Sequence, residues 1–380
     1  MTKNCFILTG MSSAQDLLPL IVESSKKDET YVLIFDNFKS KSQFFNYDLM
    51  QIKNFIKETV KKNDGKIKNI SIFGKSDEKL FQGWYVKTKP DYVFLQAINP
   101  KGQIWNPIFD NSKIILFSWH MDGTSDLIKS NQNIVLNIVR HKKELIYFGK
   151  DIPAWMNISK ENQKKINSFK TKFYGNIRKL SLSHNPANTT LNLLNSLKSK
   201  KVCFIAEAHI RLGDIKYFKK STGSCIDKLI KDLKKKDYYI VWKKREKGFP
   251  KKDYSPLDFC NEKPDLIIEQ DIHYPSSLFA IPEISNLNIV INTSSCIFDL
   301  YDISKNTIMV LTTNESDREK KYLDLRYKDN GYAIYNLTNQ NDYLSFLNTI
   351  KDIEITNLQS NEKEKSIEDV YEMIKKDVVK

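Results

Sequence analysis

The sequence predicts an α/β protein of two Rossmann-like, doubly wound domains, and three observations support this prediction. First, a chain of 380 residues is longer than one hydrophobic core usually supports, so about two domains are expected. Second, short β-branched runs alternate with amphipathic stretches, which is typical of a parallel sheet flanked by helices. Third, the strand pattern disappears between about residues 153 and 190 and then begins again, which indicates a second domain.

The first half of the chain has the pattern of one such domain, which we place at residues 1–185. Strand-like runs cover residues 5–9, 31–35, 67–73, 92–98 and 114–119. One helix is expected after the turn at residues 10–13, reaching about residue 24. A second is expected over residues 44–60, where Leu49, Ile52 and Ile56 recur at helical spacing.

The second half predicts a domain of the same kind over residues 186–355. Its strands are expected at residues 201–206, 238–242, 266–268, 289–291 and 307–311. Its helices are expected at residues 225–233, after a long loop, and at 277–284 and 296–303. Residues 356–380 read as a charged linker and a helix with one apolar stripe, and we expect this helix to pack back on the first domain.

The formal net charge of +14, from 60 Lys and Arg against 46 Asp and Glu, leaves two interpretations open. It favours polyanionic surroundings such as phosphorylated substrates or an anionic membrane surface. It also fits a Lys- and Asn-rich coding bias that leaves solvated lysines everywhere. Because the lysines do not interleave with aromatic residues, as they do in a nucleic-acid platform, no nucleic-acid partner is expected.

Other patterns narrow the class of protein. No run approaches the roughly 20 apolar residues of a membrane span, and the N-terminus does not read as a signal peptide. The five scattered cysteines form no CxxC pair, which favours reduced thiols, a cytoplasmic location and no zinc site. The absence of a GxGxxG series and of a P-loop argues against a nicotinamide or flavin dehydrogenase and against an ATPase.

Residues 292–295, Asn-Thr-Ser-Ser, lie at a predicted turn from strand to helix. The hydroxyls of Ser294 and Ser295, together with the free N–H groups of a helix N-terminus, could hold a phosphate group. An ordinary helix N-cap is the alternative, although it needs only one of the two hydroxyls.

Two other loops at this sheet edge carry reactive side chains. Residues 207–214 include Glu207 and His209, either of which could contact a ribose or the leaving phosphate. After the next strand, Lys243 or Arg245 could neutralise a donor diphosphate, and a solvated basic loop is the alternative.

In the first domain, the strand over residues 114–117 ends in Ser-Trp-His-Met-Asp-Gly-Thr. The imidazole of His120 could remove a proton from an acceptor hydroxyl at neutral pH, with Asp122 orienting it. The alternative is a structural histidine at a strand end, in which case Asp122 or Glu207 is the next candidate for the base.

These motifs resemble those of the CDP-glycerol glycerophosphotransferase family and related surface-polysaccharide transferases. In these families a donor-side strand ends in an acidic-aromatic-Ser-Ser turn, and a helix with Phe-Asp follows. Residues 289–299 are similar, with Asn292 and Thr293 replacing the first two residues of the turn. Residues 118–124 are similar to the acceptor-side Trp-His-Gly-Thr motif with two residues inserted. Arg211 resembles the arginine of the equivalent loop, whereas the family's Lys-x-His-Pro element lacks its His-Pro here.

The resemblance covers about residues 202–312 well and the first half loosely, and it implies the GT-B arrangement. In that arrangement two Rossmann-like domains face each other across a cleft, with the acceptor on the first and the donor on the second. The implied catalytic residues are His120 and Asp122, and the implied donor-binding residues are Arg211, Lys243, Arg245, Ser294, Ser295 and Asp299. Protein cations and helix dipoles usually replace a divalent metal in this fold, so we expect no metal and no cofactor besides the nucleotide-activated substrate.

The expected activity is therefore transfer of a sugar from a nucleotide-activated donor to a cell-surface glycan acceptor. Two alternatives stay open: transfer of a polyol phosphate from a CDP-linked donor, and a non-catalytic nucleotide- or glycan-binding protein of the same fold. A lipid-linked acceptor would fit a peripheral position at the inner face of the membrane, held there by the basic charge.

Overall fold

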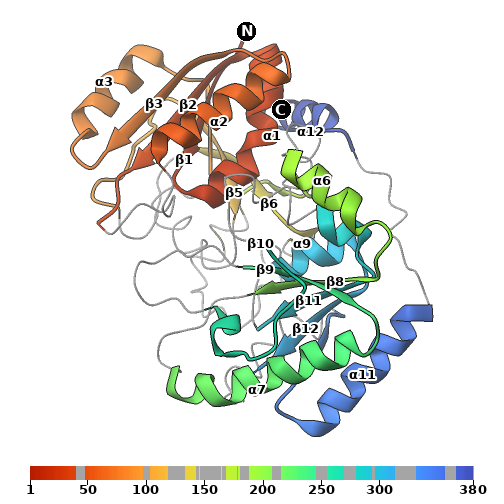
Figure 1. Ribbon diagram of the computed structural model, residues 1–380. Helices are drawn as coiled ribbons and strands as arrows, with labels where there is room; N and C mark the ends of the chain where they lie inside the picture. Colours follow the sequence, from red (N-terminus) through yellow and green to blue (C-terminus); the bar gives the residue numbers. More distant parts are fainter. Residues whose placement is uncertain are drawn as a thin grey trace. The chain divides into compact units, whose positions relative to one another are not determined.

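A computed structural model of the chain divides into two compact units, each built around its own sheet (Figure 1). The first unit consists of residues 1–185 and 363–380, and the second of residues 186–362. The structure describes residues 1–39, 48–96, 103–118, 133–142, 145, 164, 168–177, 179, 188–207, 215–244, 255–268, 280–292, 296–312, 331–355 and 365–379.

The sheet of the first unit is parallel throughout the described residues, in the order β3-β2-β1-β4-β5-β6-β7. Its strands are β1 (Lys3–Leu8), β2 (Glu29–Asp36), β3 (Ile67–Gly74), β4 (Tyr92–Leu95), β5 (Lys113–Ser118), β6 (Ile134–Val139) and β7 (Thr171–Lys172). The order reverses between β1 and β4, which is the switch point at which doubly wound folds usually bind ligands.

Helices α1 (Met11–Lys27), α2 (Leu49–Lys62), α3 (Glu78–Thr88) and α12 (Ile367–Val379) belong to this unit. Helix α2 begins where the carboxylate of Asp48 accepts a hydrogen bond from the Met50 backbone, and it buries Ile52, Ile56 and Val60 along one stripe. Helix α3 contributes Phe81 to an aromatic cluster over the sheet face that carries Cys5 and Ile7.

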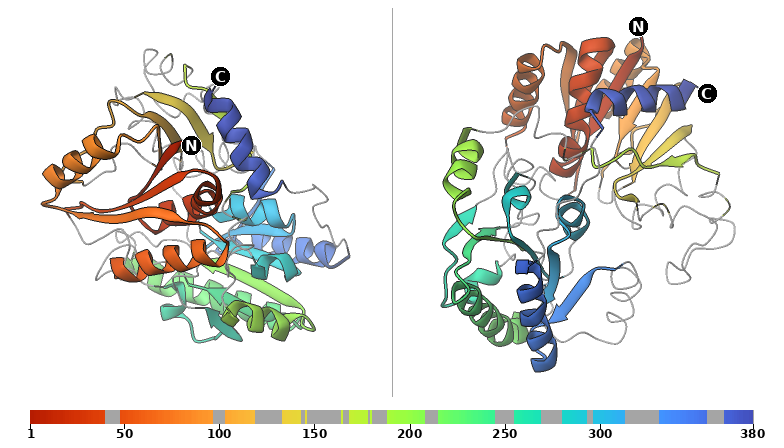
Figure 2. Two further views of the ribbon diagram at one scale, coloured as in Figure 1. Left: turned by 90° about the horizontal axis from the view of Figure 1, so that it is seen from above. Right: turned by 90° about the vertical axis from the view of Figure 1, so that its right-hand side faces the viewer.

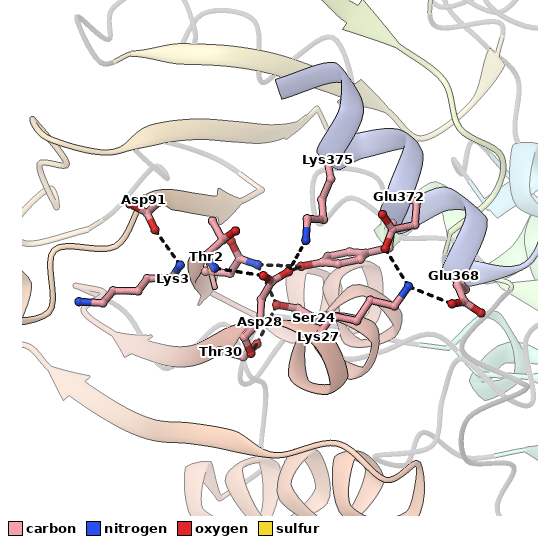
Figure 3. A network of polar contacts seen from close by, with 12 residues as sticks. Thr2, Lys3, Ser24, Lys27, Asp28, Thr30, Asp91, Glu368, Glu372 and Lys375 are labelled. Carbon is pink, nitrogen blue, oxygen red and sulfur yellow. Dashed lines mark hydrogen bonds and ion pairs between the residues drawn. The ribbon is translucent and has the colours of Figure 1, made fainter. Parts of the chain in front are cut away.

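The C-terminal helix α12 packs on α1, as both views of Figure 2 show. Tyr371 is fully buried, and its hydroxyl donates to Asp28 at 2.8 Å while accepting from Asn4 at 2.7 Å. Asp28 also accepts from Lys375 at 2.8 Å and from the Thr2 backbone at 3.1 Å (Figure 3). This network fixes the last helix to the first strand and helix of the chain.

The sheet of the second unit is also parallel, in the order β10-β9-β8-β11-β12-β13. Its strands are β8 (Val202–Glu207), β9 (Tyr239–Lys243), β10 (Leu266–Ile268), β11 (Leu287–Ile291), β12 (Thr307–Leu311) and β13 (Ala333–Asn336). The order reverses between β8 and β11, so this unit repeats the doubly wound pattern of the first. The predicted fold class, two parallel-sheet α/β domains, is thus confirmed.

In the described part of the second unit, the named helical segments are α6 (Asn188–Leu197), α7 (Ile215–Lys234), η6 (Pro256–Phe259), α9 (Cys296–Ile303) and α11 (Gln340–Ile355), and residues 280–284 are helical as well. Apolar residues of α7 and α11, among them Leu229 and Phe346, share one core cluster with Ile205 and Trp242 of the sheet. Helix α9 packs against β11 and β12.

The structure corrects some of the predicted boundaries. Helix α7 begins at Ile215 rather than at residue 225, because the Lys, Ser, Thr and Gly residues of its first half hide the helical pattern. Thr171 and Lys172 form a short edge strand within the stretch where no strand was predicted, since two residues cannot show alternation. Strands β6 and β13 and helices α3 and α11 were not predicted at all. Across the described ranges, no helix has the length and apolar character required to span a bilayer.

Candidate functional site

The candidate site is the carboxyl edge of the second sheet, at the switch point between β8 and β11. The register pairs Ile291 of β11 with Glu207 of β8, and Ala206 of β8 with Lys243 of β9. Three polar residues, Glu207, Lys243 and Asn292, therefore stand at the ends of three neighbouring strands. Helix N-termini reach a parallel sheet at this same edge, where their free N–H groups favour anionic ligands.

The Glu207 side chain connects two other segments of the chain at this edge through hydrogen bonds. One carboxylate oxygen, Oε2, accepts from the Trp242 indole at 2.9 Å and from the Ser255 hydroxyl at 2.6 Å, and the side chain is buried. Ser255 in turn caps η6, because its hydroxyl accepts from the Leu257 backbone and its own N–H donates to Asp258. Glu207 thereby holds the segment that begins at Ser255 against the ends of β8 and β9.

Lys243 is the last residue of β9 and is only 1% exposed. This burial excludes the solvated-loop interpretation for Lys243, since a solvated lysine keeps its ammonium group in water. The adjacent Lys244 continues the strand pairing through its backbone, which donates to Ile268 at 3.0 Å. The predicted contact of Lys243 with a donor diphosphate stays a prediction.

Asn292 ends strand β11. Its backbone N–H donates to Val310 at 2.7 Å, and its φ of 58° then turns the chain into the left-handed region that Asn tolerates better than most residues. Its side-chain oxygen accepts from the backbone and hydroxyl of Thr312 at 3.0 and 3.1 Å. A further contact joins Thr312 to Thr222 of α7 at 3.4 Å, and both threonines are buried, so a chain of polar contacts links the ends of β11 and β12 to α7.

Asp299 lies in the first turn of α9 and is completely buried. A carboxylate near a helix N-terminus is stabilised by the unpaired N–H groups and the positive end of the helix dipole. Its predicted contact with a donor stays a prediction.

The sheet edge of the first unit also contains polar groups. A cavity of about 20 Å³ lies at the ends of β5 and β6, and its lining includes Ser118, Asp16 and Arg140. This volume is enough for one water molecule or one ligand hydroxyl. The Ser118 hydroxyl donates to Asn137, which holds the last residue of β5 in place immediately before the motif predicted to carry the base.

Several residues of the predicted site lie outside the described part of the chain. They are His120, Asp122, Arg211, Arg245, Ser294 and Ser295. Sequence reasoning gave Lys243 and Asp299 as donor-binding residues, and did not assign the strand-end role of Asn292 or the contacts of Trp242 and Ser255 with Glu207. In the described ranges no three His, Cys, Asp or Glu side chains gather in a way that could hold a metal ion.

Three cysteines of this unit, Cys203, Cys225 and Cys260, are poor candidates for a nucleophile. Burial raises the pKa of the Cys203 thiol well above its usual range and raises the pKa of Cys260 to about 12. Burial also raises the pKa of Cys225. Thiols with raised pKa values are protonated at neutral pH and react slowly.

Comparisons with solved structures place this chain in the GT-B class of two-domain α/β folds. UDP-GlcNAc 2-epimerase from Methanocaldococcus jannaschii superimposes with a TM-score of 0.58 at 11% identity, over 99% of this chain and 100% of that chain. S. aureus MnaA, solved with UDP, gives 0.52 at 12% identity, over 98% and 95%. The wall teichoic acid polymerase TagF gives 0.50 at 14% identity, over 100% and 89%.

At sequence identities of 11% to 14%, the similarity shows the fold alone. No protein-family model matches the sequence, and no curated protein matches it significantly.

Proposed function

We propose that this protein is a transferase that binds a nucleotide-activated donor at the carboxyl edge of its second sheet. The observation that carries the proposal is the placement of Glu207, Lys243 and Asn292 at the β8/β11 switch point, with α9 beginning four positions after Asn292. Solved structures of the same fold include one with UDP and one with UDP-GlcNAc and UDP, which supports a nucleotide as the ligand of this edge.

In the proposed complex the donor diphosphate lies over the N-terminus of α9. Ser294 and Ser295 donate from their hydroxyls, and Lys243, with Arg211 and Arg245, supplies positive charge. These groups stabilise the leaving phosphate as charge develops on it, so the reaction is proposed to need no divalent metal.

The acceptor is proposed to bind at the corresponding edge of the first sheet. His120 follows β5 directly, and its imidazole takes the proton of an acceptor hydroxyl, with Asp122 orienting the ring. The deprotonated oxygen then attacks the activated carbon of the donor sugar. The bond to the leaving oxygen breaks, and a nucleoside diphosphate is released.

A second candidate reaction is transfer of a polyol phosphate from a CDP-linked donor. The resemblance of residues 289–299 to the glycerophosphotransferase signature favours it, as does the fold similarity to TagF, one structure of which was soaked with CDPG. In this case the acceptor oxygen attacks phosphorus and CMP is released. The acceptor in both reactions is proposed to be a cell-surface glycan, free or lipid-linked.

A nucleotide-binding screen tests the proposal. Thermal-shift measurements with CMP, CDP, UDP, GDP and their sugar or polyol derivatives should show one nucleotide class that stabilises the protein, by about 2.7 kcal/mol at one hundred times its dissociation constant. Replacing Ser294 and Ser295 together with Ala should weaken that binding by about 1 to 3 kcal/mol while the melting temperature without ligand changes little.

Product analysis separates the candidate reactions, because a released nucleoside diphosphate indicates sugar transfer and released CMP indicates polyol-phosphate transfer. Binding without release of either product would identify a non-catalytic binding protein. If no nucleotide stabilises the protein, the proposal is wrong.

A further inference from the structure

The side-chain amide of Asn292 has two ends with different environments. Its oxygen accepts from the backbone N–H of Thr312 at 3.0 Å and from the Thr312 hydroxyl at 3.1 Å. A backbone N–H can only donate, so the atom that faces Thr312 must be the oxygen, and the orientation of the amide is fixed by this contact. The NH₂ group is therefore directed away from Thr312.

This NH₂ group is shielded from solvent and, within the described residues, has no hydrogen-bond acceptor. Natural proteins nearly always supply a partner to a buried N–H, so the exception calls for a physical reason. The strand-end role of Asn292 does not provide one. Aspartate tolerates the same left-handed backbone, and its carboxylate would accept from Thr312 equally well. What asparagine has at this position and aspartate lacks is the NH₂ group, together with the absence of a charge.

The surroundings identify the kind of acceptor that fits. The chain runs from Asn292 into the N-terminus of α9, which begins at Cys296, and the buried Lys243 lies on the same sheet edge. A helix N-terminus and an ammonium group both favour a negative ligand. An NH₂ group donates and cannot accept, so it complements a phosphate oxygen and repels a cation.

We infer that Nδ2 of Asn292 donates a hydrogen bond to a phosphate oxygen of the bound nucleotide, which makes Asn292 a ligand-binding residue of the donor site. The inference rests on the proposed nucleotide site. In this arrangement one amide has two functions: its oxygen holds the end of β12 through Thr312, and its nitrogen holds the ligand. Binding of the phosphate is thereby coupled to the packing of two neighbouring strands.

Three variants separate these functions. Asn292→Asp keeps the shape, the backbone preference and the acceptor for Thr312, but replaces the donor with a negative charge. Asn292→Gly keeps the left-handed backbone and removes both functions. The control, Thr312→Val, removes one hydrogen bond to the oxygen of Asn292 and leaves the NH₂ group intact.

Isothermal titration calorimetry with the nucleoside, nucleoside monophosphate and nucleoside diphosphate of the preferred base gives the readout. We expect Asn292→Asp and Asn292→Gly to bind the diphosphate about 10- to 100-fold more weakly than the wild type, because a hydrogen bond to a charged group is lost. Binding of the nucleoside should change less than twofold. Thr312→Val should keep nearly full diphosphate affinity, even where its melting temperature falls.

The inference is overturned if both Asn292 variants fold and keep the wild-type affinity for the diphosphate, or if they lose affinity for the nucleoside and the diphosphate by the same factor. An equal loss of affinity in Thr312→Val would show that the effect comes from strand packing, and this result would also overturn the inference. A wild-type protein that binds no nucleotide would instead refute the proposed function, and the inference with it.

Discussion

Replacing Tyr371 with Phe removes one oxygen atom from the contact between α12 and α1 and leaves the buried ring in place. The lost hydroxyl donates to the carboxylate of Asp28 at 2.8 Å and accepts from Asn4 at 2.7 Å. Neither partner becomes unpaired, because Asp28 keeps its bonds to Lys375 and Thr2, and Asn4 keeps its bond to Ser24. The free energy lost with each hydrogen bond is therefore expected to lie at the lower end of the usual range.

The magnitude follows from these two bonds. A hydrogen bond to a charged group contributes about 1.5 kcal/mol at its lower end, and a neutral one about 0.5 kcal/mol, so docking of α12 should weaken by about 2 kcal/mol. This free energy corresponds to a change of about 30-fold in the local opening equilibrium. Amide hydrogen exchange of the peptide that contains α12 should accelerate by that factor, while exchange of β8 and β11 in the second unit stays unchanged.

Lys27→Met provides the control on the same interface. Lys27 bonds Glu368 and Glu372 at 2.9 and 2.8 Å, but these carboxylates are 66% and 52% exposed. Exposed pairs of this kind contribute about 0 to 1 kcal/mol, so exchange of α12 should accelerate only about twofold. If Tyr371→Phe has no larger effect than Lys27→Met, the buried network does not hold the helix.

Further predictions concern packing, pH and activity. Gly223→Ala should destabilise the second unit by about 1 to 3 kcal/mol and lower its melting temperature, because the added Cβ would lie 2.1 Å from the Phe259 carbonyl oxygen. Gly83→Ala should raise the melting temperature of the first unit, because Gly83 lies in a helix and has open space around it. Burial alone raises the pKa of Asp28 and of Asp377, but hydrogen bonds from lysine and tyrosine side chains outweigh it and lower both pKa values below the usual range. Both carboxylates therefore stabilise the fold fully above about pH 4, and this stabilisation is lost as the pH falls further. The difference in melting temperature between the wild type and Asp28→Asn should thus be smaller at about pH 3 than at about pH 6. His120→Ala should reduce turnover by about 10² to 10⁴ while donor binding stays intact; unchanged turnover would exclude it as the base. Anionic vesicles should bind the protein at low salt and release it as salt rises, and lack of binding at low salt would show that the net charge is only a matter of composition.

The sequence predicted the fold class and most strands because buried parallel strands are short β-branched runs between helical patterns. Cys296 to Ile303 and Thr307 to Leu311 were predicted at their observed bounds. Helix α7 begins ten residues before its predicted start, because its polar first half includes Gly223, which the close approach of Phe259 requires. Local pattern cannot reveal a requirement that comes from a segment far along the chain.

The candidate site depends on the order of the strands, and that order is a tertiary property. Strand-end residues such as Glu207 and Lys243 could be found from the sequence, but the bonds of Glu207 to Trp242 and Ser255 connect segments that local patterning does not relate. The same holds for Asp28 and Tyr371, which bond across 343 positions. An apolar stripe predicts the helix near the C-terminus, but it does not reveal which carboxylate the helix contacts.

The most direct test of the donor site is a hydrogen-exchange footprint of the wild-type protein with and without its preferred nucleoside diphosphate. Binding at the switch point should slow exchange in the peptides that carry the ends of β8, β9 and β11 and the start of α9, while the first sheet and α12 exchange as before. Protection confined to the first unit, or none at a saturating nucleotide concentration, would contradict the assignment of the donor site to the second sheet.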